Sequence, residues 1–281
     1  MPEFLTWINE ILQLFVRLCI VIHVIQNKKM FTIPELDKQQ INDFNGNGFV
    51  MVRNAFSPEV MQRIKQWTDE LSSLPEEPGK HWVYHEKSRL DPKIDLISRI
   101  EKFSPYHAGF RELGNLLKKP VAQLLGEEAV MFKEKINFKM PGGDGFKPHQ
   151  DSQAGWEDYA SYFINVMVCI DEATIENGCL QLVAGYQNKG LFREWEPLTD
   201  EDMSGMTFIH YPTSPGDLVF FDCYVPHASE PNMTNKTRRL YFATYNRMSE
   251  GEHLDRYYAD KHRTYPPDID RLPEKEYVFR V

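Results

Sequence analysis

Two histidines and one aspartate have the side-chain types and the spacing of a metal site. His149 and Asp151 form an H-x-D pair, and His227 follows a proline much later in the chain. On an extended backbone, side chains two positions apart point to the same face, so both members of the pair can bind one ion. His227 completes this ligand set only if the fold brings its segment back beside the pair.

The composition of this ligand set indicates a particular chemistry. Two histidines and one carboxylate on one face of an octahedral ion leave three open positions, as in non-haem Fe(II) oxygenases. An isolated H-x-D pair is common by chance, so its surroundings matter. A Gly-Asp-apolar-Asp segment at 216–222 leads directly to His227, and two arginines, Arg238 and Arg239, follow. An arginine there can anchor a dicarboxylate co-substrate through a bidentate pair, and strand alternation allows only one of the two to point inward.

These residues need a framework of paired strands to bring them together. Alternating apolar residues and turn signals predict strands at 49–52, 130–140, 162–170, 179–183, 206–210, 218–222 and 239–245. Strands at such short spacing, mostly without helices between them, favour a mainly β fold, an antiparallel barrel or jelly roll. Helices are expected at 35–45, 58–74 and 108–125 as support, whereas 75–105 is expected to be irregular.

The N-terminal segment 1–29 does not continue this pattern, and residues 30–281 are expected to form a single domain. The apolar stretch 11–25 contains Gln13, Arg17 and His23 and is shorter than the roughly 20 residues that cross a bilayer. It also lacks the pattern of a secretory signal. Three explanations stay open: a mis-assigned start with Met30 as the initiator, a docked amphipathic helix, or a membrane anchor.

Composition excludes several classes of protein. The chain carries 32 Lys+Arg against 41 Asp+Glu, a net charge of −9, which argues against a nucleic-acid partner. Its 42% hydrophobic and 26% charged residues are typical of an ordered globular protein. The 4 cysteines show no CxxC spacing, so we expect a reduced, cytoplasmic protein. The oligomeric state is not fixed by these features.

The order His149-x-Asp151, His227, Arg238, with the segment NGFVMVRNAFSPEVMQRIKQW, resembles the phytanoyl-CoA dioxygenase family of Fe(II)/2-oxoglutarate oxygenases over about residues 35–250. The resemblance implies a double-stranded β-helix, a cupin-like jelly roll with N-terminal helices. It also implies that the two histidines and the aspartate are the catalytic iron ligands, and that Arg238 pairs with the C5 carboxylate of 2-oxoglutarate. Asn137 and Lys135, on the preceding strand, are implied as further co-substrate contacts, although Lys135 could also face solvent.

The resemblance also implies the type of reaction. Halogenating relatives lack the carboxylate ligand, whereas Asp151 is present here, so hydroxylation of a C–H bond with 2-oxoglutarate and O2 is expected. A non-catalytic jelly-roll metal-binding sensor is the alternative from another class. An arginine that anchors a co-substrate argues against it.

The substrate is less well defined by the sequence. The segment 79–110 and the loop SQAGWEDYASY mix cations, hydroxyls and aromatic rings, which suits a small polar anion or zwitterion. The segments HQDSQAGW, NGCLQLVAG and REWEPL resemble members that hydroxylate 2-aminoethylphosphonate, a step of phosphonate catabolism. Another small zwitterion or a lipid-derived acid stays open. Trp156 or Tyr159 is expected to face an ammonium group of the substrate. The tail 250–281 is expected to wrap the barrel or cap its mouth. Asn246 and Arg247 are possible residues of that mouth.

Overall fold

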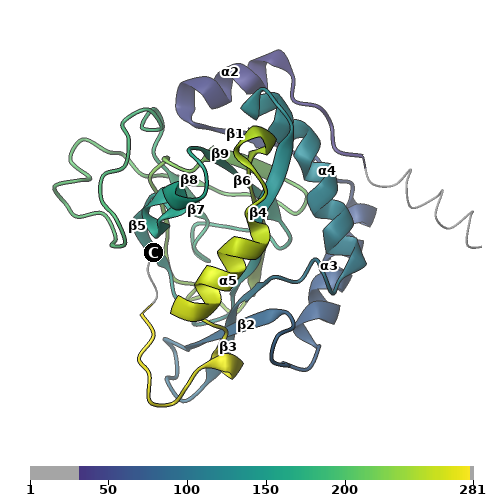
Figure 1. Cartoon of the computed structure of the whole chain (residues 1–281), viewed down its shortest axis with the longest axis vertical. Helices are drawn as coiled ribbons and strands as arrows, with labels where there is room; N and C mark the ends of the chain where they lie inside the picture. Colours follow the sequence, from purple (N-terminus) through teal and green to yellow (C-terminus); the bar gives the residue numbers. More distant parts are fainter. Residues whose placement is uncertain (1–31, 279–281) are drawn as a thin grey trace, which may run out of the picture.

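The computed structural model describes residues 32–278, and the predicted extension 1–29 lies outside that range. Two antiparallel sheets form the framework (Figure 1). The larger sheet has the order β1-β9-β6-β11-β4-β3-β2 and the smaller one β5-β10-β7-β8. The larger sheet comprises β1 (Phe49–Val52), β2 (Trp82–Lys87), β3 (Asp95–Glu101), β4 (Ala129–Lys139), β6 (Phe163–Cys169), β9 (Leu218–Asp222) and β11 (Arg238–Arg247). The smaller sheet comprises β5 (Phe146–His149), β7 (Leu180–Leu182), β8 (Ile209–Tyr211) and β10 (His227–Ser229).

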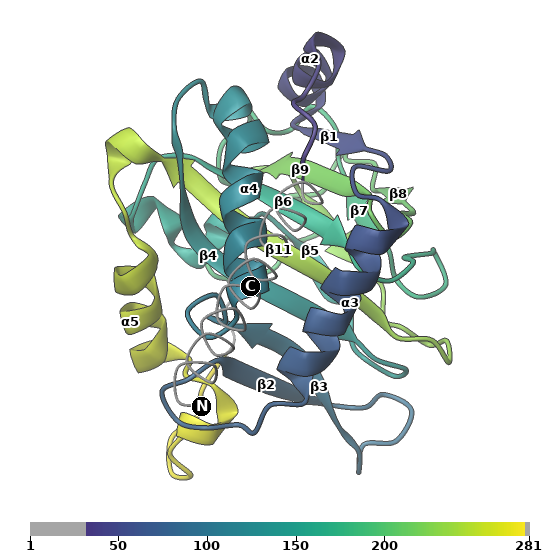
Figure 2. The ribbon, with the colours of Figure 1, turned by 90° about the vertical axis from the view of Figure 1, so that its right-hand side faces the viewer.

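Helices cover one face of the larger sheet. Figure 2 shows α3 (Pro58–Ser72) and α4 (Ala108–Leu125) lying across it, while α2 (Lys38–Asn47) precedes β1. The Ser57 side chain caps α3, whose first residue is proline. The helix predicted at 35–45 begins at residue 38 because the Asp37 carboxylate accepts a hydrogen bond from the Gln40 backbone N–H. It ends at Gly48, whose positive φ of 84° suits glycine.

The two faces of the larger sheet differ in chemistry. Ile136 and Phe138 of β4 belong to the apolar core that contains α3 and α4 residues. The alternate positions of β4 are polar: Lys133, Lys135, Asn137 and Lys139. Because strand side chains alternate between faces, these polar residues point toward the smaller sheet. The mainly β jelly roll expected from the sequence is therefore confirmed, with a polar interior on one side.

Two local predictions are wrong, and one helix was not predicted. Residues 75–105 contain the paired strands β2 and β3, which extend one edge of the larger sheet. Their apolar alternation is obscured because the inward face carries charged residues. The strand predicted at 206–210 lies at Ile209–Tyr211. The C-terminal tail lies against the barrel, as expected, and contains a helix, α5 (Leu254–Thr264), that was not predicted; α5 packs along β4 through the buried Tyr258.

Short 3-10 turns complete the described elements: η1 (Asp151–Ala154), η2 (Trp156–Asp158), η3 (Met248–Glu250) and η4 (Asp268–Asp270). Within residues 32–278, none of the helices combines the length and apolar composition that crossing a bilayer requires.

Candidate active site

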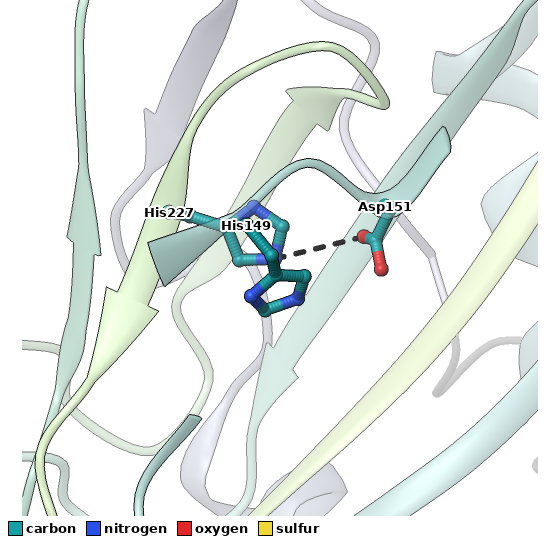
Figure 3. A group of neighbouring side chains, drawn as sticks. All are labelled: His149, Asp151 and His227. Carbon is teal, nitrogen blue, oxygen red and sulfur yellow. Dashed lines mark ion pairs between the residues drawn. The ribbon is translucent and has the colours of Figure 1, made fainter. Parts of the chain in front are cut away.

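The H-x-D pair and the distant histidine meet where β5 and β10 pair. His149 and His227 are direct antiparallel partners, and Asp151 is the first residue of η1. The ligand atoms of all three side chains lie within 4.8 Å of one another (Figure 3). The ring centroids of the histidines are 4.1 Å apart, and His227 Nε2 lies 3.7 Å from Asp151 Oδ2. The fold thus brings together the three residues that the sequence analysis placed in one ligand set.

Backbone carbonyls orient both imidazole rings. The Nδ1 of His149 donates to the Lys147 carbonyl at 2.7 Å, and the Nδ1 of His227 donates to the Val225 carbonyl at 3.0 Å. Because a carbonyl oxygen can only accept, the proton is on Nδ1 in each ring and the lone pair is on Nε2. A histidine that binds a metal through Nε2 needs this tautomer, with Nδ1 held by a hydrogen bond.

The protonation states also suit a cation. Burial, followed by the charge of His227, lowers the pKa of His149 to about 3. Burial likewise lowers the pKa of His227. Burial alone raises the pKa of Asp151, but His227 and the nearby lysines outweigh this and lower it to about 2. Two neutral imidazoles and one carboxylate are the deprotonated donors that a divalent transition metal requires, so the residues present fit Fe(II).

A buried hydrogen-bond chain fixes the carboxylate. The Asn165 amide Nδ2 donates to Asp151 Oδ2 at 3.0 Å, and the Thr244 hydroxyl donates to Asn165 Oδ1 at 2.6 Å. Neither Asn165 nor Thr244 was predicted from the sequence as a residue of the site. The available signal was a single asparagine within the apolar strand FINVMVC, because a buried polar side chain needs a partner.

A small inner cavity of about 40 Å³ extends from the ligand set to Arg238. The buried Arg238 donates from Nη2 to the Gly178 carbonyl at 2.8 Å, and its Nε has no acceptor within residues 32–278. Arg239 lies on the opposite face, where it binds both carboxylate oxygens of Asp171, at 2.6 and 3.0 Å, and also pairs with Asp69. The expected alternation of the two arginines is therefore present, and Arg238 is the one that lines a cavity with His149, Asp151 and His227.

Two further predicted residues line the inner cavity. Lys135 and Asn137 contribute side chains to it from β4. The Asn137 Oδ1 is buried and has no donor among the residues that the structure describes. Lys135 also lines a larger outer cavity, so it stands between the two spaces rather than facing bulk solvent.

The outer cavity has a volume of about 710 Å³ and shares His149 and Asp151 with the inner one. Its wall carries Lys133 from β4, Arg99 and Glu101 from β3, and Lys261 from α5. Burial lowers the pKa of Lys133 well below its ordinary value and that of Lys261 to about 7. Each of these amines therefore gains from an anionic neighbour, which favours its charged form.

Several expectations about the substrate region are corrected. Trp156 is only 1% exposed and its ring is covered by the Lys133 ammonium at 3.8 Å, so it is not available to a substrate ammonium group. Asn246 binds the backbone carbonyls of Arg247 and Gly251, and neither Asn246 nor Arg247 lines the cavities described here. Tyr159 does line the outer cavity.

Only some of the polar and aromatic side chains in segment 79–110 line a cavity beside the candidate site. Tyr84, His85 and Arg99 line a neighbouring cavity of about 450 Å³ that also reaches His149. Lys80, His81 and Tyr106 line none of these three cavities.

Comparison with known proteins gives a consistent result. The phytanoyl-CoA dioxygenase family model matches residues 44–240. A 2-aminoethylphosphonate dioxygenase from an uncultured bacterium (HF130_AEPn_1) is 40% identical over 244 residues, covering 85% of this chain and 93% of the relative. A methylphosphonate hydroxylase from Gimesia maris is 33% identical over 247 residues, covering 82% and 88%.

Solved structures agree in fold. EctD from S. alaskensis, crystallised with 2-oxoglutarate and 5-hydroxyectoine, superposes with a TM-score of 0.66 at 20% identity, covering 76% of this chain and 77% of that one. The carbocyclase SnoK from nogalamycin biosynthesis gives a TM-score of 0.63 at 16% identity, covering 85% and 95%. At these identities the likeness concerns the jelly-roll framework.

Proposed function

This chain belongs to the phytanoyl-CoA dioxygenase family, and from that premise we propose that it hydroxylates 2-aminoethylphosphonate or a closely related small aminophosphonate. It is an Fe(II)/2-oxoglutarate-dependent dioxygenase. The observation that carries the proposal is the set of three buried ligand atoms from His149, Asp151 and His227, all within 4.8 Å of one another. The substrate assignment is supported by the phosphonate-acting relative, which is 40% identical.

We propose that these three residues hold Fe(II). Bound there, Fe(II) with 2-oxoglutarate and O2 supplies the oxidation that places one oxygen atom in a substrate C–H bond, with succinate and CO2 as co-products. The protein provides orientation: two backbone carbonyls fix the imidazole rings, and Asn165 fixes the carboxylate. These hydrogen bonds would hold the three donor atoms in place for the ion.

Arg238, Asn137 and Lys135 are proposed to bind 2-oxoglutarate. The Arg238 guanidinium is buried, lines the inner cavity with the metal ligands, and has an Nε–H without an acceptor in the described part of the chain. A carboxylate supplies the missing acceptor through a charge-assisted hydrogen bond. This feature also argues against a sensor that binds metal alone, because such a protein has no use for a buried arginine beside the ligands.

The chemistry of the outer cavity supports a small anionic substrate. Its lining carries the basic residues Arg99, Lys133, Lys135, Lys261, Arg263 and Lys275 and the acidic residues Glu101, Asp151, Asp158, Asp260 and Glu276. Lys133 and Lys135 lie on the same strand, on the side of the cavity that Asp151 also lines. Buried amines beside His149 and Asp151 favour an anionic ligand there, because a bound anion stabilises their charged form.

We also propose a cytoplasmic role in phosphonate catabolism. Cys169, Cys179 and Cys223 are buried free thiols, as expected in a reducing compartment. A hydroxyl group on an aminophosphonate prepares the molecule for a later oxidative cleavage of its carbon–phosphorus bond.

The test is succinate formation by the Fe(II)-loaded protein with 2-oxoglutarate and O2. We expect stimulation by 2-aminoethylphosphonate, weaker stimulation by methylphosphonate, and none by acyl-CoA. The hydroxylated product should accumulate in step with succinate. His149→Ala and Asp151→Ala should abolish both products. Stimulation by an unrelated zwitterion alone would reject the substrate, and activity in either variant would reject the metal site.

A further inference from the structure

A buried amine lies beside the metal ligands without an anionic partner. Lys133 is 8% exposed, and its Nζ lies 3.8 Å from the centre of the Trp156 ring. Within residues 32–278, no carboxylate pairs with this nitrogen and no acceptor takes a hydrogen bond from it. Lys133 lines the outer cavity. Burying an ammonium group without an anion or a hydrogen-bond acceptor costs free energy, so its retention beside this cavity points to a ligand.

A second amine reaches the same cavity from α5. Lys261 Nζ donates to both carboxylate oxygens of Glu101, each at 2.7 Å, and Arg99 Nε lies 2.8 Å from the same carboxylate. An ammonium group has three N–H donors, so one donor of Lys261 remains for another acceptor. Arg99 and Lys261 therefore share the Glu101 carboxylate, and one N–H of Lys261 is left for a ligand in the cavity.

The position of this amine is set by the docking of α5. The Tyr258 hydroxyl accepts a hydrogen bond from the Lys102 backbone N–H and donates to the Glu134 carbonyl at 2.9 Å. Tyr258 is 2% exposed and packs edge-on against Trp82. Since α5 is fixed to β4 in this way, Lys261 is presented toward the cavity by a rigid element rather than by a loop.

The chemistry of the smallest phosphonate substrate restricts where the anion can lie. Methylphosphonate has a single carbon, which is bonded to phosphorus, so a methylphosphonate hydroxylase attacks the carbon next to the phosphonate group. An enzyme that attacks such a carbon must hold the phosphonate one bond away from the reacting atom. Here the cavity that contains Asp151 and His149 also contains Lys133. A cation in that position suits a phosphonate whose neighbouring carbon faces the metal.

We propose that Lys133 and Lys261 form the subsite that binds the phosphonate oxygens of the substrate, with Trp156 as the floor beneath Lys133. This inference rests on the proposed function and deepens it. The subsite selects a tetrahedral group with up to two negative charges over a planar carboxylate, because two amines on different elements can each reach a different oxygen. Lys133 is thereby a specificity-determining residue, distinct from Arg238 on the co-substrate side.

The test compares substrate and co-substrate constants in matched variants. Lys133→Met removes the charge and keeps the length of the side chain, and Lys133→Arg keeps the charge. We expect Lys133→Met to raise the KM for 2-aminoethylphosphonate by roughly 10- to 100-fold, the range set by losing one hydrogen bond to a charged group. The KM for 2-oxoglutarate should change by less than about 2-fold, and Lys133→Arg should recover most of the affinity. Lys93→Met, at an exposed lysine that lines none of the three cavities, is the matched control and should leave both constants unchanged.

Binding without turnover provides an independent measurement. Calorimetry without O2, on protein loaded with Fe(II) and 2-oxoglutarate, gives dissociation constants for 2-aminoethylphosphonate, taurine and β-alanine. These three carry phosphonate, sulfonate and carboxylate on the same aminoethyl chain. The parent protein should prefer the phosphonate, and Lys133→Met should lose most of that preference. Should Lys133→Met not fold, Lys261→Met tests the same subsite, because Arg99 still pairs with Glu101 in that variant.

The outcomes separate the two levels of the proposal. Phosphonate turnover by the parent protein with an unchanged substrate KM in Lys133→Met would overturn the subsite and leave the proposed function standing. Equal rises in the KM for substrate and co-substrate would also overturn it, because they would show that Lys133 supports the fold of the whole site and does not bind the substrate specifically. If the parent protein binds and turns over no phosphonate, both the subsite and the proposed substrate fall.

Discussion

Arg238 and Arg239 are consecutive on β11, yet their guanidinium groups lie on opposite faces of the larger sheet. Arg238 lines the cavity of the metal ligands, and Arg239 is bound by Asp171 and Asp69 outside it. Strand alternation separates them. Substitutions of the two arginines can therefore be compared, because one should affect co-substrate binding and the other only an ion pair outside the cavity.

Arg238→Met should raise the KM for 2-oxoglutarate by roughly 100-fold, because a buried charge-assisted pair with a carboxylate is lost. Steady-state kinetics at saturating substrate measure this change, and iron content should stay at the parent level. Arg239→Met is the control. It should lower the free energy of unfolding by about 1–3 kcal/mol through loss of the Asp171 pair, with the KM for 2-oxoglutarate unchanged. A reversed result would mean that Arg239 binds the co-substrate.

Asn165 is predicted to matter for metal affinity although it is not a ligand. Asn165→Ala removes the amide that donates to Asp151 Oδ2 and should weaken Fe(II) or Co(II) binding by about 10- to 100-fold. Equilibrium dialysis with metal analysis measures the dissociation constant. Thr244→Val removes only the outer member of the chain, so its effect should be smaller. Unchanged affinity in Asn165→Ala would show that the ligand geometry does not depend on this chain.

The ligand set could be predicted from the sequence because its signals are local. An H-x-D pair, a Pro-His segment and a following Arg-Arg pair are short patterns, and the neighbouring strands have clear apolar alternation. The strand predicted at 218–222 coincides with β9, and the helix predicted at 108–125 coincides with α4, despite Pro120 within it. α4 buries one stripe, which gives a helical period, whereas β9 is buried on both faces and appears as a short apolar run between turn signals.

Other features could not be predicted because they depend on contacts between distant segments. β2 and β3 carry charged residues such as Arg99 and Glu101 on their inward face, so their alternation does not look like that of a buried strand. The role of α5 depends on Lys261 reaching Glu101, 160 positions away in the chain. The Lys133–Trp156 contact arises only when η2 folds against β4, and it reverses the expectation that Trp156 faces the substrate.

Glu134 is predicted to make the stability of the protein fall as the pH rises. Burial raises the pKa of Glu134 to about 7 in the folded state, from 4.5 when exposed. Between these values the folded protein holds a proton that the unfolded chain has released, so the stabilisation present below pH 4.5 is lost as the pH rises to about 7. The total loss is about 3 kcal/mol.

Glu134→Gln tests this prediction because the amide does not titrate and can still bind Ser104, the present partner of the carboxyl group. Urea unfolding at pH 5 and pH 8 gives the free energy of unfolding of both proteins. The free energy of unfolding of the variant, relative to that of the parent, should increase as the pH rises. A constant difference at the two pH values would contradict the raised pKa.

Gly178 is predicted to link the turn after residue 175 to the position of Arg238. Its carbonyl accepts the hydrogen bond from Arg238 Nη2, and its φ is +75°. A Cβ atom at this position would clash with the Glu230 carbonyl and lie 2.9 Å from Lys139 Nζ. Gly178→Ala should therefore lower the free energy of unfolding by about 2 kcal/mol and raise the KM for 2-oxoglutarate by roughly 10-fold, because the guanidinium shifts with the turn.

Gly126→Ala provides the matched control for this variant. Gly126 also has a positive φ, 76°, but open space surrounds the place of its missing Cβ. The substitution should lower the free energy of unfolding by about 1 kcal/mol from backbone strain alone and leave the KM for 2-oxoglutarate unchanged. Thermal unfolding and steady-state kinetics on both variants distinguish backbone strain, which lowers stability, from displacement of the Arg238 guanidinium, which raises the KM for 2-oxoglutarate. If Gly178→Ala changes stability as Gly126→Ala does and leaves the KM unchanged, the Gly178 carbonyl does not position Arg238.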